Sequence, residues 1–423
     1  MKLFIILTLL VTSAWAQRPL VRGMNLTQLG GFIYDAAPAG QPKLPAQVAV
    51  DHIYNLGARH VLLNPQAKMI DPRGSDMIPE VGPAERNNER ARYKRLIDYI
   101  RSKGMTVGLR PIFFVVKPDG TFPYTERQSD GSLKTWWHGN IQPADPNRWF
   151  ESFKQYLDIY LLIGKLNKVE EFTIGAELYS MTVGIEDQWR EQPYGFPGKW
   201  LQLLRYSRGK LNPGTRMMYD INFTDDRAST NGDLTAAGGE LERWRYRIVD
   251  LANPQDPMER EIWENLVTFW KELDAIGIDM YRSLASKNDI IPREYNNLVP
   301  FLRRRSDEYA NQVDTTLAEI ESVTEQMQYM IFKEVGYRSV DRGFIDPFAY
   351  ETGAGNYNDD HMAGAFQALF ESFWQPRFPW FQGASFWDVS VAPSRNGGAG
   401  DTGFSPVGKP KTTKVLQDLY SFE

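Results

Sequence analysis

The stretch that decides the fold is residues 173–178, Thr-Ile-Gly-Ala-Glu-Leu, an apolar run that closes on a carboxylate. Residues 331–337, Ile-Phe-Lys-Glu-Val-Gly-Tyr, repeat this pattern later in the chain. A short apolar run of this kind is typical of a buried parallel strand. Glu177 and Glu334 therefore mark the ends of two strands, where functional side chains gather in α/β proteins.

Six more short apolar runs bring the number to eight. In chain order the eight runs occupy residues 21–26, 58–65, 106–113, 170–178, 216–222, 273–281, 330–337 and 383–390. They lie too far apart for hairpins and far enough apart for a crossover helix between each pair. The sequence therefore predicts parallel strands.

The segments between the runs have helical periodicity. Tyr93, Leu96, Ile97 and Ile100 follow the spacing of one helix face, and Gly104 is well placed to end that helix. Further helices are expected after Asp145-Pro146, from residue 197, and within 261–271, 292–328 and 361–374. Alternation of strand and helix predicts a single-domain (β/α)8 TIM barrel with long βα loops; a doubly wound open sheet is the alternative.

Two observations favour the barrel over the open sheet. The runs number eight, and polar or aromatic residues gather at their carboxyl ends: Asn25, Asn64, Arg110, Glu177, Asn222, Asp279, Tyr281, Glu334, Trp387 and Asp388. In a (β/α)8 barrel this edge carries the active site. We expect the long loops 117–144, 224–256 and 338–360 to line that site.

The first residues have the pattern of a secretory signal peptide. Lys2 precedes an apolar run over residues 3–11, and Ala14-Trp15-Ala16 offers a cleavage site before Gln17. The apolar run is too short for a membrane anchor, the alternative. We therefore expect residues 1–16 to be removed, residues 17–423 to form the catalytic domain, and the protein to be secreted or periplasmic, with no membrane association after cleavage.

The composition excludes several chemistries. The chain has no cysteine, which removes disulfides, thiolate nucleophiles and Cys-ligated metals. Its four histidines lack the H-E-x-x-H spacing of a zinc site. A net charge of −5 provides no basic field for nucleic acid.

Two further patterns have ordinary explanations. Residues 398–403 spell G-x-G-x-x-G, but the proline-containing stretch after them cannot open a dinucleotide-binding helix. Asp225-Asp226 and Asp359-Asp360 are expected to be solvated loop charge rather than calcium ligands. We therefore expect no metal and no cofactor. We also expect the protein to be a monomer.

The two strand-end glutamates have a joint chemical meaning. A buried glutamate costs several kcal/mol unless it is paired or functional, and a structural ion pair explains either one alone equally well. Together they match the two carboxyl groups that cleave a glycosidic bond, one donating a proton and the other attacking carbon or activating water.

Several motifs resemble those of clan A glycoside hydrolases: Gly-Ala-Glu at 175–177, Glu-Val-Gly-Tyr-Arg-Ser at 334–339, and Trp387. The nearest resemblance is to glycoside hydrolase family 113, active on β-1,4-mannan, and it runs from residues 22–25 to 403–410. It implies that Glu177 is the acid/base and Glu334 the nucleophile of a retaining enzyme, with carboxyl groups about 5–5.5 Å apart. We expect the protonated Glu177 to lie in a less polar setting than Glu334.

One position departs from the clan pattern. Many clan A enzymes carry Asn immediately before the acid/base, where its amide binds the sugar 2-hydroxyl, but this chain has Ala176. The sugar therefore stays open. A bacterial wall or exopolysaccharide glycan is an alternative substrate, and a non-catalytic glycan-binding barrel is an alternative function.

The remaining candidates are substrate-binding or supporting residues, for each of which ordinary packing is the alternative. We expect Tyr281 to hydrogen-bond the nucleophile and Arg110 to keep it charged or bind a hydroxyl. Trp387 would stack beneath a pyranose. The other candidates are Asn25, Asn64 and Asp279 as hydroxyl ligands, and Trp137, next to Trp136 and His138, as a subsite wall.

Overall fold

The computed structural model describes residues 20–27, 37, 39–185, 189–224, 239–348 and 355–422. The predicted signal peptide and the Asp225-Asp226 pair lie outside these residues. Within the described ranges, no helix combines the length and apolar character that a membrane crossing requires.

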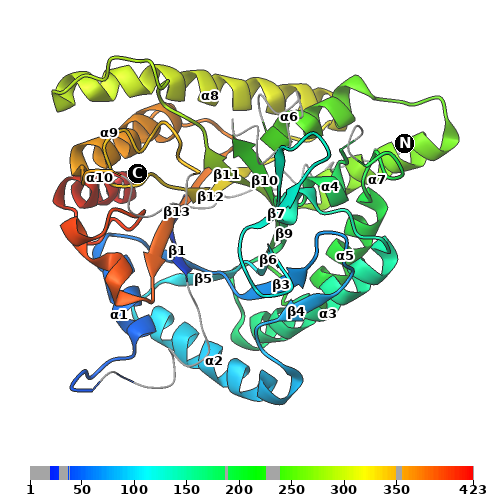
Figure 1. Cartoon of the computed structure of the whole chain (residues 1–423), viewed down its shortest axis with the longest axis horizontal. Helices are drawn as coiled ribbons and strands as arrows, with labels where there is room; N and C mark the ends of the chain where they lie inside the picture. The colour runs from blue at the N-terminus through cyan, green and yellow to red at the C-terminus, as the bar shows by residue number, and fades with distance from the viewer. Residues whose placement is uncertain are drawn as a thin grey trace, which may run out of the picture.

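Eight parallel strands of the described chain close into a barrel (Figure 1). They are β1 (Val21–Thr27), β2 (His60–Leu63), β5 (Thr106–Leu109), β9 (Glu171–Ala176), β10 (Arg216–Thr224), β11 (Ala275–Tyr281), β12 (Met330–Val335) and β13 (Phe381–Ser390). Around the barrel the order is β1-β13-β12-β11-β10-β9-β5-β2, so strands that follow one another in this series are neighbours. The predicted TIM barrel is confirmed, and each strand overlaps its predicted run.

Helices surround the strands, with the long α8 along the upper edge in Figure 1. The main ones are α1 (Pro45–Asn55), α2 (Arg86–Ser102), α3 (Pro146–Asn167), α5 (Pro197–Lys210), α7 (Pro257–Glu272), α8 (Tyr295–Thr324), α9 (Asp359–Leu369) and α10 (Pro410–Ser421). Asp145 caps α3 as expected, because its side chain accepts the backbone N–H of Arg148. The 292–328 segment forms one helix, α8.

Aromatic side chains fill the space between the barrel and the helices. Trp149, Trp200, Trp244 and Trp270 are fully buried, and Trp149 stacks on Phe153 at 4.9 Å between ring centroids. Burying such large side chains stabilises a fold that has no disulfide. Much of the aromatic content therefore belongs to the core.

Two of the barrel strands continue into a second sheet that the sequence did not predict. After Pro65 and Pro111, the chain forms β3 (Gln66–Ile70) and β6 (Ile112–Val116), which pair in parallel, while β4 (Met77–Pro79) pairs with β3. The 117–144 loop contains a hairpin, β7 (Tyr124–Arg127) and β8 (Leu133–Trp136), followed by the 3-10 turn η3 (His138–Asn140). These elements extend the barrel at its carboxyl end.

Three irregularities in strand register coincide with predicted site residues. The pairing shifts in β9 just before Glu177, in β12 between Phe332 and Glu334, and in β13 around Trp387 and Asp388. An extra residue in a strand breaks the alternation of faces and re-aims the side chains after it. In β12 the shift lets two successive side chains, Lys333 and Glu334, contact groups of the barrel interior.

Candidate active site

Glu177 immediately follows β9 and has a left-handed backbone, with φ of 55°. This conformation is uncommon for a residue with a side chain and is concentrated at functional sites. Its Oε1 accepts a hydrogen bond from Asn222 Nδ2 at 2.6 Å, and its Oε2 lies 3.0 Å from His138 Nε2. The carboxyl group is thus held at both oxygens, with 9% of the residue exposed.

Glu334, near the end of β12, is held by a different kind of partner. Arg110 Nη1 donates to Oε1 at 2.5 Å, and the Tyr281 hydroxyl donates to Oε2 at 2.8 Å. Burial raises the pKa of Glu334, whereas Arg110 and Tyr281 oppose that rise by favouring the carboxylate. The hydrogen bonds expected from Tyr281 and Arg110 are therefore present.

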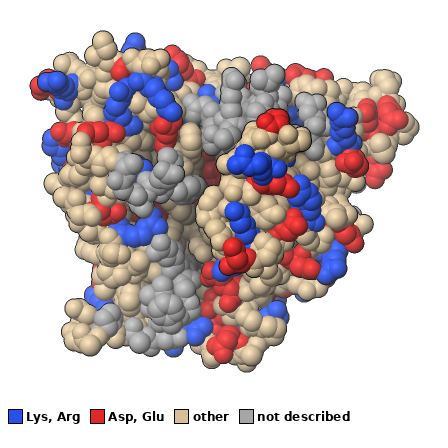
Figure 2. Space-filling model, viewed as in Figure 1, with Lys and Arg blue, Asp and Glu red and all other residues tan. Residues whose placement is uncertain are grey.

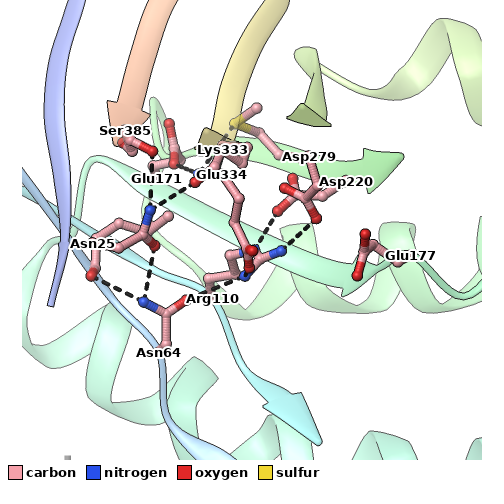
Figure 3. Close-up of polar contacts among 12 residues, drawn as sticks. Asn25, Asn64, Arg110, Glu171, Glu177, Asp220, Asp279, Lys333, Glu334 and Ser385 are labelled. Atoms are coloured by element: carbon pink, nitrogen blue, oxygen red, sulfur yellow. Dashed lines mark hydrogen bonds and ion pairs between the residues drawn. The ribbon is translucent and has the colours of Figure 1, made fainter. Parts of the chain in front are cut away.

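Arg110 joins three carboxyl groups inside the barrel (Figure 3). Besides Glu334, its Nε donates to Asp220 and its Nη2 to Asp279, each at 2.6 Å. Burial raises the pKa of Asp220 and lifts that of Asp279 well above its usual range, against the effect of Arg110. One cation therefore organises several acidic side chains, and Glu177 lies apart from this cluster in Figure 3.

The three predicted hydroxyl ligands are fully buried: Asp279 belongs to this cluster, and Asn25 and Asn64 adjoin it. Asn25 Nδ2 donates to the backbone oxygens of Lys333 and Ser385, and Asn64 Nδ2 donates to Asn25 Oδ1 at 3.0 Å. Asn64 Oδ1 in turn accepts from Arg110 at 3.4 Å, and Asp279 binds the same guanidinium. The structure therefore places these three side chains as supports of Arg110; a role in binding hydroxyls stays a prediction.

A cavity of about 430 Å³ opens above the two glutamates. Its base includes Arg110, Ala176, Glu177 and Glu334, and His138 also lines it. One wall of the cavity comes from β13, β1 and the loop after β13, and consists of Trp387, Asp388, Thr27 and Arg395. Another comes from β3, β6 and the following loop, and consists of Gln66, Lys68, Ile112, Phe114 and Phe122. Both candidate catalytic carboxyl groups therefore face one space large enough for a ligand.

The two predicted tryptophans have different positions. Trp387 is half-buried and lines the cavity. Trp137 is also half-buried, but its ring packs against His138 and Tyr179, and it is not among the lining residues. The Trp136-Trp137-His138 segment thus brings His138, rather than Trp137, into the cavity.

Sequence reasoning missed a second charged cluster below the site. Lys333 forms a buried ion pair with Glu171, and Arg216 lies 3.8 Å from the same carboxylate. Burial opposes the charge of Glu171, but Lys333, His60 and Arg216 lower its pKa to about 2. The signal was available, because a lysine and a glutamate inside apolar runs must pair if both are buried.

Asp220 and Glu240 were also missed. Asp220 lies two residues before Asn222 on β10, so alternation predicts that the two share the inner face. Glu240, on the short helix α6 (Gly239–Arg245), accepts the Asn222 backbone N–H at 3.2 Å and the Trp244 indole N–H at 3.0 Å. No feature of the local sequence around Glu240 indicates these contacts.

On the face shown in Figure 2, basic and acidic side chains of the described residues are interspersed. Among the described residues, no group of three or more His, Cys, Asp or Glu side chains is arranged to hold a metal ion. Asp359 instead accepts backbone N–H groups of Lys411 and Thr412 at the start of α10.

A (β/α)8 barrel whose fourth and seventh strands each present a glutamate to one cavity has the architecture of a glycoside hydrolase. In agreement, residues 254–409 match the model of Glycoside Hydrolase Family 113. The chain is therefore a glycoside hydrolase with a family 113 β-mannanase-like TIM barrel.

Solved structures of other proteins share this fold. A family 113 β-mannanase from Alicyclobacillus acidocaldarius is 16% identical over 96% of this chain and 98% of its own, with a TM-score of 0.63. A second family 113 β-1,4-mannanase is 17% identical over 96% of this chain and all of its own, with a TM-score of 0.58. A family 5 mannosidase from Rhizomucor miehei is 9% identical over 95% and 92%, with a TM-score of 0.50. No curated protein sequence matches the chain.

Proposed function

We propose that this protein is a secreted, retaining glycoside hydrolase that cleaves a β-linked, mannan-like polysaccharide or oligosaccharide with Glu177 as acid/base and Glu334 as nucleophile. The observation that carries the proposal is the shared cavity: both carboxyl groups line it, from the fourth and seventh barrel strands. Paired carboxyl groups on either side of a bound sugar are the machinery of glycoside cleavage.

The surroundings of the two glutamates distinguish their roles. Both glutamates have polar hydrogen-bond partners, so the charge of those partners, rather than their polarity, distinguishes the two roles. Glu334 meets a guanidinium and a phenol, which favour the carboxylate that a nucleophile needs. Glu177 meets a carboxamide and an imidazole and has no Arg or Lys among its hydrogen-bond partners in the described chain. We therefore assign the role of proton donor to Glu177.

In the first step, a carboxylate oxygen of Glu334 attacks the anomeric carbon. The glycosidic C–O bond breaks, and Glu177 transfers its proton to the departing oxygen, which leaves as a hydroxyl. Arg110 and Tyr281 hold Glu334 in place for this attack. The product of the step is a glycosyl ester of Glu334 and an ionised Glu177.

In the second step, Glu177 acts as the base. It takes a proton from a water molecule whose oxygen attacks the anomeric carbon, and the bond to Glu334 breaks. Glu334 leaves as a carboxylate and Glu177 is protonated again. Two inversions give net retention of configuration, and neither step needs a cofactor.

A mannan-like substrate is supported by the family match and by the names of the similar structures, which are β-mannanases. Ala176 lines the cavity and cannot donate a hydrogen bond to a 2-hydroxyl from its side chain. Secretion follows from the predicted signal peptide, and we propose that the mature protein acts as a monomer.

The test is hydrolysis of β-1,4-mannan, β-glucan and peptidoglycan by the purified protein, read as new reducing ends. We expect mannan to be cleaved, with the β-anomer formed first in an NMR time course. Glu334→Gln should abolish turnover while leaving the fold intact, and Glu264→Gln, on the exposed surface of α7, should have no effect. Cleavage of another glycan alone would change the substrate, and near-normal turnover by Glu334→Gln would refute the assignment. Oligosaccharide binding without cleavage would indicate a glycan-binding protein.

A further inference from the structure

His138 is a histidine that the proposed mechanism leaves without a role. It begins the turn η3, which follows the β7–β8 hairpin, and it lines the cavity beside Glu177. Asn140 stabilises the turn by accepting the Trp137 backbone N–H and donating to the Thr135 carbonyl. The imidazole packs edge-on against Phe113 and Trp137, with ring centroids 5.9 and 4.7 Å away. Its position is therefore fixed by the hairpin and by aromatic packing.

The partners of Glu177 determine which of its oxygens carries the proton. Asn222 Nδ2 can only donate, so Oε1 accepts a hydrogen bond whether or not the carboxyl group is protonated. The proton of the neutral acid therefore belongs on Oε2. The described residues give Oε2 one hydrogen-bonding partner, Nε2 of His138 at 3.0 Å.

We propose that His138 is a positioning residue for the acid/base: neutral His138 accepts the Oε2 proton of Glu177 through Nε2 and so keeps Glu177 protonated until the substrate arrives. This inference rests on the proposed function. When the glycosidic oxygen enters the cavity, it replaces Nε2 as the acceptor of that proton. The proton then passes from Oε2 to the leaving oxygen, and His138 itself neither gains nor loses one.

Glu334 on β12, Asp279 on β11 and Glu240 on α6 each interact electrostatically with Glu177. The cations Arg110, Lys68 and Arg395 line the same cavity. Arg110 is bound to Glu334, Asp220 and Asp279, so in the described chain the hydrogen-bonding partner of Glu177 Oε2 is His138.

The test compares His138→Phe with wild type on two substrates. One is mannopentaose, whose sugar leaving group needs a proton; the other is 2,4-dinitrophenyl β-mannobioside, whose leaving group does not. We expect kcat/KM for mannopentaose to fall about 10- to 100-fold, less than the roughly 100- to 10,000-fold contribution of general acid catalysis, because Glu177 itself remains. For the dinitrophenyl substrate we expect less than about a threefold change. The basic limb of the kcat/KM profile for mannopentaose should move to lower pH, because the neutral acid loses its acceptor.

Two variants make the result specific. His138→Gln retains a side-chain acceptor and should restore part of the lost activity, whereas His52→Phe, on α1 outside the site, should behave as wild type. If kcat/KM fell equally for both substrates, the role of His138 would be merely structural. If the basic limb moved to higher pH, His138 would donate to the carboxylate. Either result overturns the proposal. Labelling of Glu334 by 2-deoxy-2-fluoromannosyl fluoride in wild type tests the proposed function separately. Absence of labelling and of mannan cleavage would make that function, rather than His138, the point of failure.

Discussion

Arg110 Nη1 lies 2.5 Å from Glu334 Oε1, and this contact joins the third barrel strand to the seventh. The guanidinium also binds Asp220 and Asp279 on the fifth and sixth strands, so one side chain connects four strands at the base of the cavity. Arginine suits this position because its planar fork offers several donors in fixed directions. The candidate nucleophile is therefore oriented by the same residue that binds the barrel mouth together.

Replacing Arg110 with lysine tests this relationship. Lysine keeps the positive charge but cannot reach three carboxyl groups in the same geometry. We expect kcat/KM to fall by at least about 100-fold, as for the loss of a positioned charge at an active site. The free energy of unfolding, measured in urea, should fall by about 3 kcal/mol, because buried acidic groups lose their partner.

The control is Arg148→Lys, whose arginine pairs with Asp76 at 2.7 Å on the surface. An exposed ion pair contributes little, so activity and stability should be unchanged. If Arg110→Lys behaved like this control, the buried cluster would have no part in positioning Glu334.

Replacing Tyr281 with phenylalanine removes the second donor to Glu334. Because that hydrogen bond favours the carboxylate, its loss raises the pKa of Glu334 further above its usual value. The nucleophile must be ionised, so the acidic limb of the kcat/KM profile should move to higher pH, with a fall of about 10-fold or more at the optimum. Tyr206→Phe, which removes a hydrogen bond to Asp158 between surface helices, should leave the profile in place. An acidic limb that stayed fixed in Tyr281→Phe would assign it to another group.

Much of the site was predictable because strand ends in a barrel converge. Glu177, Arg110 and Tyr281 lie at or near the carboxyl ends of apolar runs, and eight such runs specify which edge they share. The Tyr281 and Arg110 contacts with Glu334 follow from that convergence. Their catalytic roles stay predictions.

The rest depended on features that a single strand does not encode. The register shift in β12 that brings both Lys333 and Glu334 to the interior is a property of the pairing with β11. Gly277 on β11 permits this arrangement, because a Cβ at that position would collide with the Asp220 side chain. The β3–β6 sheet was missed because the predicted run 58–65 stops at Pro65 and the run 106–113 joins two strands across Pro111. In the structure the chain begins a new strand directly after each proline.

Glu240 should make the stability of the protein depend on pH. Burial raises its pKa to about 8, so the folded protein holds a proton that the unfolded chain releases near pH 4.5. The contribution of this group is therefore complete below about pH 4.5 and is lost as the pH rises through about 8. We expect the free energy of unfolding of wild type to fall over this interval relative to Glu240→Gln, in urea titrations at a series of pH values. Glu242→Gln on the same helix, where the carboxylate contacts Arg245, should keep the wild-type dependence of unfolding free energy on pH. If Glu240→Gln showed that same dependence, Glu240 would be ionised in the folded protein.

Phe122 should contribute to substrate binding without affecting the chemical step. Half of the residue is exposed, and it lines the cavity beside Phe114, with ring centroids 5.5 Å apart. If the cavity binds sugars as proposed, this exposed apolar ring offers a face for their C–H groups. Phe122→Ala should raise KM for mannopentaose about 3- to 10-fold, equivalent to about 1 kcal/mol of binding, with kcat unchanged. Leu133→Ala, which removes a still more exposed apolar side chain on β8 outside the cavity, should leave KM unchanged. A loss of kcat in Phe122→Ala at unchanged KM would show that the ring positions the catalytic groups instead of the sugar.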